Sequence, residues 1–177
     1  MRTLQGGFTL VEAVIAMLVV AILLAMAVPA WSSALARTHA TAAQAALLAS
    51  LQRSISHAAI AGAEVVLCPA VAGDCDDGWD WSDGWIAYAD IDGDRRHGAN
   101  ETLLHQEPAL PADIRLFTSK GRKRLVFQPN GGNAGSNVTF TLCTGDDPER
   151  TASMILSNGG QLRSGSPSRS QIARCKK

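Results

Sequence analysis

The first third of the chain consists of one apolar run followed by a periodic one. Residues 8–28, FTLVEAVIAMLVVAILLAMAV, hold a single charged side chain, that of Glu12. A helix of about 20 apolar residues spans the hydrocarbon of a bilayer, so the run predicts a transmembrane helix. A carboxylate inside such a segment is energetically unfavourable, which makes Glu12 a candidate functional residue that needs a partner.

The helical pattern continues beyond the apolar run. Pro29 lacks an amide hydrogen, so we expect it to kink the helix or to loosen one turn. Apolar residues then recur at three- and four-residue steps in an Ala-rich sequence, namely Leu48, Leu51, Ile55 and Ala59. This periodicity predicts one helix from Phe8 to about Ala61, whose second half is amphipathic and packs against a globular head.

After Gly62 the pattern changes to short β-rich runs separated by turn sequences. We therefore predict an α+β fold, in which the long helix packs on an antiparallel sheet or on a pair of small sheets. The expected strands are Glu64–Cys68, Trp85–Asp90, Glu101–His105, Ile114–Ser119, Arg124–Gln128, Val138–Cys143 and Met154–Ser157, with Gln161–Arg163 as an additional candidate.

The charges are unevenly distributed, although the formal net charge is zero. Residues 64–119 hold three basic and twelve acidic groups, a balance of −9, whereas residues 120–177 hold ten basic and three acidic groups, a balance of +7. A basic C-terminal third suggests an anionic partner.

The four cysteines, Cys68, Cys75, Cys143 and Cys175, all follow the apolar segment. No Cys-x-x-Cys pair occurs, which gives little support to zinc or redox motifs. An even number in an exported domain is typical of disulfides, and four cysteines allow three pairings. We expect Cys68 to pair with Cys75 and Cys143 with Cys175; the alternative is that some thiols are free and buried.

Small residues precede the apolar run, whereas an ordinary secretory signal is cleaved after it. The sequence Gly7-Phe8-Thr9-Leu10-Val11-Glu12 resembles the class III signal of type IV pilins and type II secretion pseudopilins. This resemblance implies that a prepilin peptidase cleaves after Gly7 and methylates Phe8. It also implies that Glu12 neutralises the N-terminus of a neighbouring subunit during assembly, which agrees with the need of a carboxylate in lipid for a cation. The alternative is a plain membrane anchor.

The order of features in the head is similar to that of the H-type pseudopilin and FimT-type minor pilin family. The matching stretches, in chain order, are CPAVAGDC, WSDGWIAYADIDGDRRHGANETLL, ALPADIRLF, RLVFQPNG, VTFTLC and MILSNGGQLR. The resemblance implies a pilin-like lollipop shape. The expected organisation is a leader peptide (1–7), a transmembrane helix (8–29), an amphipathic continuation (30–62) and a β-rich periplasmic head with a basic, flexible tail (63–177). These stretches do not distinguish a pilus subunit from a secretion subunit.

Two sequences in the acidic region suggest ligands, each with a simpler alternative. Asp90, Asp92, Asp94 and Glu101 have the spacing of four calcium ligands of an EF-hand loop, but Arg95 stands where that loop needs glycine. We therefore expect a solvated hairpin and no metal. Tryptophans in the loop DCDDGWDWSDGW could form an interface or stack on bases, but acids surround them, so we expect them to cover a small core.

The basic side chains form two groups. One occupies a predicted hairpin turn and the other follows the tail: Lys120, Arg122, Lys123 and Arg124, then Arg163, Arg169, Arg174, Lys176 and Lys177. Flexible basic segments suit phosphate backbones. The resemblance also implies DNA binding, because some FimT-type minor pilins use a Gly-Arg-x-Arg motif; here Gln161 replaces its first arginine and Arg163 matches the second. The alternatives are a solvated face or a surface that recognises another pilin.

No catalytic arrangement appears, since the four histidines are scattered and neither a nucleophile elbow nor a P-loop is present. We predict no enzyme activity and no cofactor. The expected protein is a minor pilin or pseudopilin in the bacterial inner membrane with its head in the periplasm. Its expected partners are other pilins, the prepilin peptidase and DNA. The alternative machine is the type II secretion system, which exports folded proteins.

Overall fold

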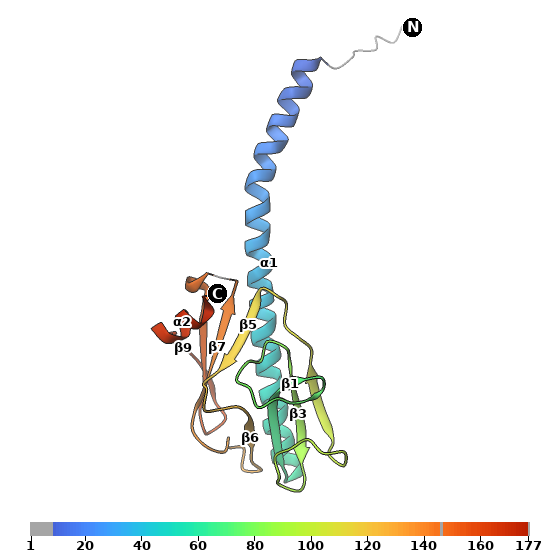
Figure 1. Ribbon diagram of the computed structural model, residues 1–177, viewed down its shortest axis with the longest axis vertical. Helices are drawn as coiled ribbons and strands as arrows, with labels where there is room; N and C mark the ends of the chain where they lie inside the picture. Colours follow the sequence, from blue (N-terminus) through green and yellow to red (C-terminus); the bar gives the residue numbers. More distant parts are fainter. Residues whose placement is uncertain (1–8, 146, 177) are drawn as a thin grey trace, which may run out of the picture.

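The computed structural model describes residues 9–145 and 147–176 and has the predicted lollipop shape (Figure 1). A single helix, α1 (Leu10–Ala61), projects from a β-rich head. Thr9 caps its N-terminus, and Gly62 ends it in a left-handed conformation with φ of 69°. The helix is continuous through Pro29. Phe8, where we expected the helix to begin, lies outside the described residues.

The two halves of α1 have different surroundings. Every residue from 10 to 32 is exposed, whereas the second half buries one side against the head. The predicted stripe is partly wrong, because Leu48 is 41% exposed and Ala59 is also exposed. The buried stripe consists of Ala43, Leu47, Ser50, Leu51, Ser54 and Ala58.

The buried stripe contains serines because their hydroxyls are satisfied within the helix. Ser50 Oγ donates to the carbonyl of Ala46 at 2.9 Å, and Ser54 Oγ donates to the carbonyl of Ser50 at 2.8 Å. Ser50 Oγ also accepts the indole N–H of Trp85 at 2.9 Å. Small, internally bonded side chains therefore let α1 approach the sheets closely.

The first sheet of the head holds five antiparallel strands. Its order is β2-β1-β3-β4, and β6 pairs with the remaining side of β1. The strands are β1 (Glu64–Val71), β2 (Asp74–Cys75), β3 (Trp85–Asp90), β4 (Leu103–Glu107) and β6 (Leu125–Phe127).

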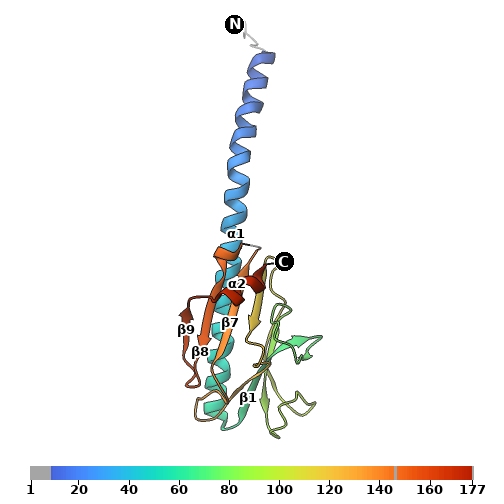
Figure 2. The same cartoon turned by 60° about the vertical axis from the view of Figure 1, so that its left-hand side comes forward.

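The second sheet holds four antiparallel strands in the order β5-β7-β8-β9. They are β5 (Ile114–Thr118), β7 (Val138–Thr144), β8 (Ala152–Leu156) and β9 (Leu162–Gly165), with the 3₁₀ helix η1 (Pro148–Arg150) between β7 and β8. Figure 2 shows this sheet with the short helix α2 (Arg169–Cys175) in front of it.

The core lies between α1 and the inner faces of the two sheets, and Leu47, Phe127 and Phe140 are fully buried in it. Trp81 and Trp85 are fully buried there as well, with the Trp81 ring edge-on to Phe140 at 5.5 Å. Trp79 instead packs on Phe117, with ring centroids 5.1 Å apart, outside this main core. The expectation that the tryptophans cover a core is therefore met by two of the three.

The structure corrects the prediction of a flexible tail. After β9 the chain forms α2, whose N-cap Ser168 makes a reciprocal capping box with Gln171. Gln171 Nε2 then donates to Thr141 Oγ1 at 3.0 Å and to Ser153 Oγ at 3.3 Å on the outer face of the second sheet. These contacts and the bond of Cys175 to Cys143 hold the tail on the sheet.

Candidate functional site

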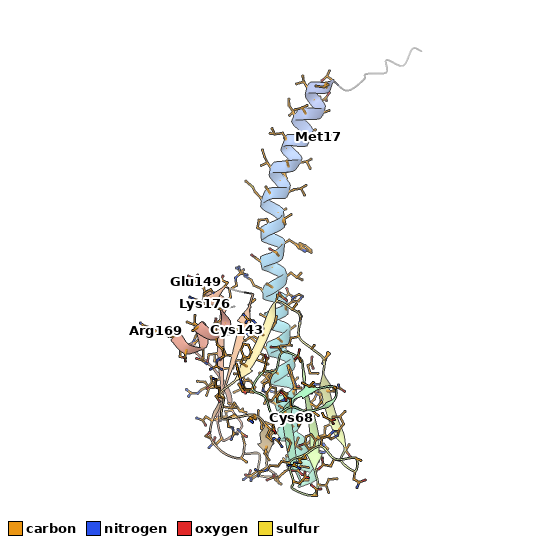
Figure 3. All side chains as sticks on the ribbon, viewed as in Figure 1. Met17, Cys68, Cys143, Glu149, Arg169 and Lys176 are labelled. Atoms are coloured by element: carbon orange, nitrogen blue, oxygen red, sulfur yellow. A yellow bond between two sulfur atoms is a disulfide. The ribbon has the colours of Figure 1, made fainter. Side chains whose placement is uncertain are left out.

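The apolar half of α1 is one candidate site. Figure 3 shows its side chains, Met17 among them, pointing outward on all sides of the helix without contact to the head. The helix is long and apolar enough to cross a membrane, a test that signal sequences also pass. Gly7 and Phe8, the expected processing residues, lie outside the described residues.

Glu12 lies in the first turn of this helix, at the third helical position. Its backbone N–H donates to Thr9 Oγ1 at 3.3 Å. A carboxylate near a helix N-terminus is stabilised by the partial positive charge there. Within residues 9–145 and 147–176 no cation pairs with Glu12. The structure therefore provides local support for the Glu12 carboxylate but no counter-ion for it.

The basic residues of the turn between β5 and β6 do not form the single cluster that we expected. Arg122 Nη2 donates to Asn133 Oδ1 at 2.9 Å and to the carbonyl of Ala134 at 2.8 Å, and burial lowers the pKa of this guanidinium. Arg124 donates to the carboxylate of Asp77, and this contact is the main reason that the pKa of Asp77 is lowered. Both guanidinium groups thus bind other residues of the head, Arg122 in a partly buried position and Arg124 at the surface, so the expected single cluster of free cations is not formed.

A basic surface forms instead around α2. Lys120 and Arg174 both lie over the ring of Trp79, with Lys120 Nζ 5.8 Å and Arg174 Cζ 5.1 Å from its centroid. Figure 3 shows Arg169 and Lys176 on the same side of the head. We call this set, Lys120, Arg169, Arg174 and Lys176, the α2 basic surface. Lys123 is exposed in the turn, and Lys177 lies outside the described residues.

Arg163 lies on β9, opposite Ile155 of β8. Opposed residues of an antiparallel pair point to the same face, so Arg163 belongs to the outer face that carries α2. The alternation in β7 identifies that face: Phe140 and Leu142 pack in the core, whereas Thr141 contacts α2. Arg163 therefore lies on the face of the sheet that bears the α2 basic surface.

Both disulfides join the pairs expected from the sequence. Cys68 bonds Cys75 with a Cα–Cα distance of 5.6 Å, and Cys143 bonds Cys175 with a Cα–Cα distance of 5.4 Å. The first closes the hairpin between β1 and β2, and the second fixes the end of α2 to β7. Together they account for all four cysteines of the chain.

The carboxylates of the loop between β3 and β4 approach one another but bind their own backbone. Ligand oxygens of Asp90, Asp92 and Asp94 lie within 4.8 Å of one another. Asp90 accepts the N–H groups of Gly93 and Arg95, and Asp92 accepts that of Asp94. Burial raises the pKa of Asp90. The loop is an ordered turn between β3 and β4, in which Asp90 and Asp92 accept backbone N–H groups.

Polar links between α1 and the head were not anticipated from the sequence. His39 Nδ1 lies 2.8 Å from a carboxylate oxygen of Asp113, before β5. Arg53 Nη1 lies 3.1 Å from His105 Nδ1, whose other nitrogen is 3.1 Å from Glu107. The two pairs that join α1 to the head, His39 with Asp113 and Arg53 with His105, are 74 and 52 residues apart in sequence, so no local pattern signals them.

The comparisons with known proteins agree with this architecture. Residues 43–160 match the family described as Type II transport protein GspH, and residues 2–28 match the prokaryotic N-terminal methylation motif. The chain belongs to the GspH family. A comparison with curated proteins gives no significant match.

Two solved structures resemble this GspH-family protein in fold. One is the type IV minor pilin FimU of Pseudomonas aeruginosa, with 18% sequence identity and a TM-score of 0.60. The match covers 73% of this chain and 90% of the FimU chain. The other is the minor pseudopilin EpsH from the type 2 secretion system of Vibrio cholerae, with 14% sequence identity and a TM-score of 0.52. The match covers 74% of this chain and 99% of the EpsH chain. At these identities the likeness shows the fold, and the family match assigns the chain to the GspH proteins; its N-terminal helix is apolar.

Proposed function

We propose that this GspH-family protein is a filament subunit that a prepilin peptidase cleaves after Gly7 and methylates at Phe8. In this proposal Glu12 neutralises the N-terminus of an adjacent subunit as the helices bundle. The observation that carries the proposal is the apolar half of α1, where every residue from 10 to 32 is exposed. Such a surface needs a bilayer or other helices to cover it.

The proposed location is the bacterial inner membrane with the head in the periplasm. Two disulfides in the head suit an oxidising compartment. Trp31 is exposed two residues after Pro29, where an aromatic side chain suits the membrane–water interface. The contact of Arg150 with Ser33 Oγ, at 3.3 Å, brings η1 close to this point of the helix. The head would therefore sit directly on the membrane surface.

Cleavage is tested with the variant Gly7→Val expressed with the peptidase. A branched side chain next to the cleaved bond should block processing, so only full-length protein should accumulate on gels and in mass spectra. Gln5→Val, with the same new side chain two residues away, is the matched control and should be processed. Mature-length protein from Gly7→Val would refute the assigned bond.

We propose DNA binding as a second function, which would place the protein in a type IV pilus. The supporting observation is the α2 basic surface, together with Arg163 on the same face of the sheet. Cations on and beside α2, which a disulfide holds on the sheet, suit a phosphate backbone. Arg122 and Arg124 are not included, because their guanidinium groups bind within the head.

The experiment is a DNA titration of the oxidised full-length protein in non-ionic detergent at several salt concentrations. A variant with Arg163, Arg169, Arg174, Lys176 and Lys177 changed to Gln tests the surface, and Arg37→Gln with Arg96→Gln controls for loss of charge. Micromolar binding that weakens with salt and is lost only in the first variant supports DNA uptake. No binding at low salt would favour a secretion pseudopilus.

A further inference from the structure

An open hollow lies on the outer face of the second sheet, beside α2. Its volume is about 280 Å³. Six of its nine lining residues carry hydroxyls, including Ser119 after β5, Thr139 on β7 and Ser166 after β9. Gln171 and Arg174 of α2 also line it. The hollow is therefore built from four separate parts of the chain, since Ser153 and Ile155 of β8 line it as well.

The charge of this hollow is positive. Arg174 is the one charged residue among those that line it, and none of them is acidic. Arg174 Nη1 donates to the carbonyl of Thr118 at 3.2 Å, which fixes the guanidinium between Trp79 and the hollow. A guanidinium has five N–H donors, so one bond to a carbonyl leaves others for a ligand. Lys120 lies over the ring of Trp79 as well and adds a second positive charge nearby.

We infer that this hollow binds a tetrahedral oxyanion of the phosphate class. A phosphate accepts hydrogen bonds on all its oxygens, which matches a wall of hydroxyl donors around one guanidinium. Carboxylates would repel such a ligand, and the lining contains none. An apolar ligand does not suit the hollow, because Ile155 is its one apolar lining residue.

The hollow is held in place before any ligand arrives. The disulfide of Cys175 to Cys143 and the capping box of Ser168 with Gln171 fix α2 at its two ends. Gln171 bridges Thr141 and Ser153, which belong to neighbouring strands. Such preorganisation lowers the entropy lost on binding, so a small ligand can be held by few contacts.

The oxyanion has two sources, free inorganic phosphate and the phosphodiester of a nucleic acid. The second source rests on the DNA binding proposed above, whereas the first does not. The experiment therefore titrates both probes separately into the oxidised full-length protein in non-ionic detergent. The probes are inorganic phosphate and an oligothymidylate of about 12 nucleotides.

We expect phosphate to bind saturably, with a Kd on the order of millimolar or tighter by calorimetry. Arg174→Gln should weaken binding roughly tenfold or more, because it removes charge-assisted bonds. Arg174→Lys keeps the positive charge, so it should bind phosphate more tightly than Arg174→Gln does. Thr139→Val, nearly isosteric on a strand, should weaken binding about threefold and leave the fold intact. Arg96→Gln, an equal loss of charge in the β3–β4 loop, should have no effect.

Phosphate binding that is unchanged in both Arg174→Gln and Thr139→Val would overturn the inference, as would the absence of saturable binding. If the oligonucleotide binds and phosphate does not, the hollow is not an oxyanion site although the DNA proposal stands. If phosphate binds with the expected variant pattern and the oligonucleotide does not, the inference stands with free phosphate as the source, and the DNA proposal fails.

Discussion

The two halves of α1 differ in composition and in their surroundings: the first is almost entirely apolar, whereas the second mixes alanines with polar side chains. In the first half every side chain from residue 10 to residue 32 is exposed. In the second half, Leu47 and Ala58 are fully buried, and Ser50 receives a hydrogen bond from the head. The second half thus buries its apolar side within the chain, whereas the apolar surface of the first half needs a membrane or neighbouring helices to cover it.

This difference shows that apolar content alone does not indicate where a helix is buried. The second half packs through small residues and self-bonded serines, which bring the helix axis close to the sheets. The first half carries large side chains such as Leu18, Leu23 and Met26 on all faces. A helix that is apolar all round belongs in lipid or in a bundle, whereas a striped one belongs against a sheet.

The largest expected effect concerns Glu12. Replacing it by Ala should leave membrane insertion unchanged and should abolish incorporation into the filament, because the neighbouring N-terminus loses its counter-charge. Incorporation is measured by recovery of the variant in sheared filaments or by crosslinking to the other subunits. Glu12→Gln keeps the size and polarity of the side chain but removes its charge, so it should fail in the same way. Restored incorporation by Gln would show that polarity, and not charge, is what Glu12 provides.

Substitutions of one leucine in each half of α1 compare how much the two halves contribute to the stability of the head. Leu47 is 0% exposed, and Leu47→Ala should lower the free energy of unfolding by about 2–5 kcal/mol because it leaves a cavity. Leu18 is 59% exposed, so Leu18→Ala should leave the stability of the head unchanged. Urea unfolding in non-ionic detergent, followed by tryptophan fluorescence, compares the two. Equal losses from both variants would contradict the division of α1 into two halves.

The disulfide between β7 and α2 should have a somewhat smaller effect. Cys143 and Cys175 are separated by 32 residues, and a crosslink over such a loop stabilises a protein by about 2–4 kcal/mol. Changing both residues to Ser should lower the urea midpoint of the head accordingly. Hydrogen exchange should show protection lost first in α2 and β9. Protection retained in α2 would mean that Gln171 and the capping box suffice to hold it.

The smallest expected effect is the pH dependence from Asp90. Its pKa is raised by burial, so the folded state binds a proton more tightly than the unfolded state. The stability contributed by this group therefore falls as the pH rises from the unfolded value, about 3.9, through the raised folded value. Asp90→Asn removes this titration, so the curve of stability against pH should be flatter for the variant in that window. Parallel curves would contradict the assignment.

Much of the fold could be predicted from local patterns. Helical periodicity located α1, and β-rich runs between turn sequences located β1 and β3 to β9 within a few residues of their observed bounds. The exposed apolar half of α1 was equally evident, because its signal is a continuous run. These features depend on neighbours in sequence, so the sequence alone contains the information.

The features that were missed depend on contacts between distant residues. The helix α2 has only seven residues and is held by bonds of Gln171 to two strands and by a disulfide. Arg122 was expected to be a surface cation, but its guanidinium donates to Asn133 Oδ1 and to the carbonyl of Ala134. The buried stripe of α1 includes polar Ser50 and Ser54, which a hydrophobic pattern excludes. For these reasons the sequence spacing of the basic residues could not show which of them lie together on the surface of the head.

The proline in the middle of α1 has a mechanical consequence. Pro29 has no N–H to donate, so the carbonyl of Ala25 lacks its usual partner one turn earlier, although the helix is continuous. At this point the helix can lengthen or bend with the loss of fewer hydrogen bonds than elsewhere along α1. The head, which begins to contact the helix at Ser33, would remain intact during such a change. In an assembled filament, Pro29 would therefore be the point of α1 where a change of length or direction costs the least.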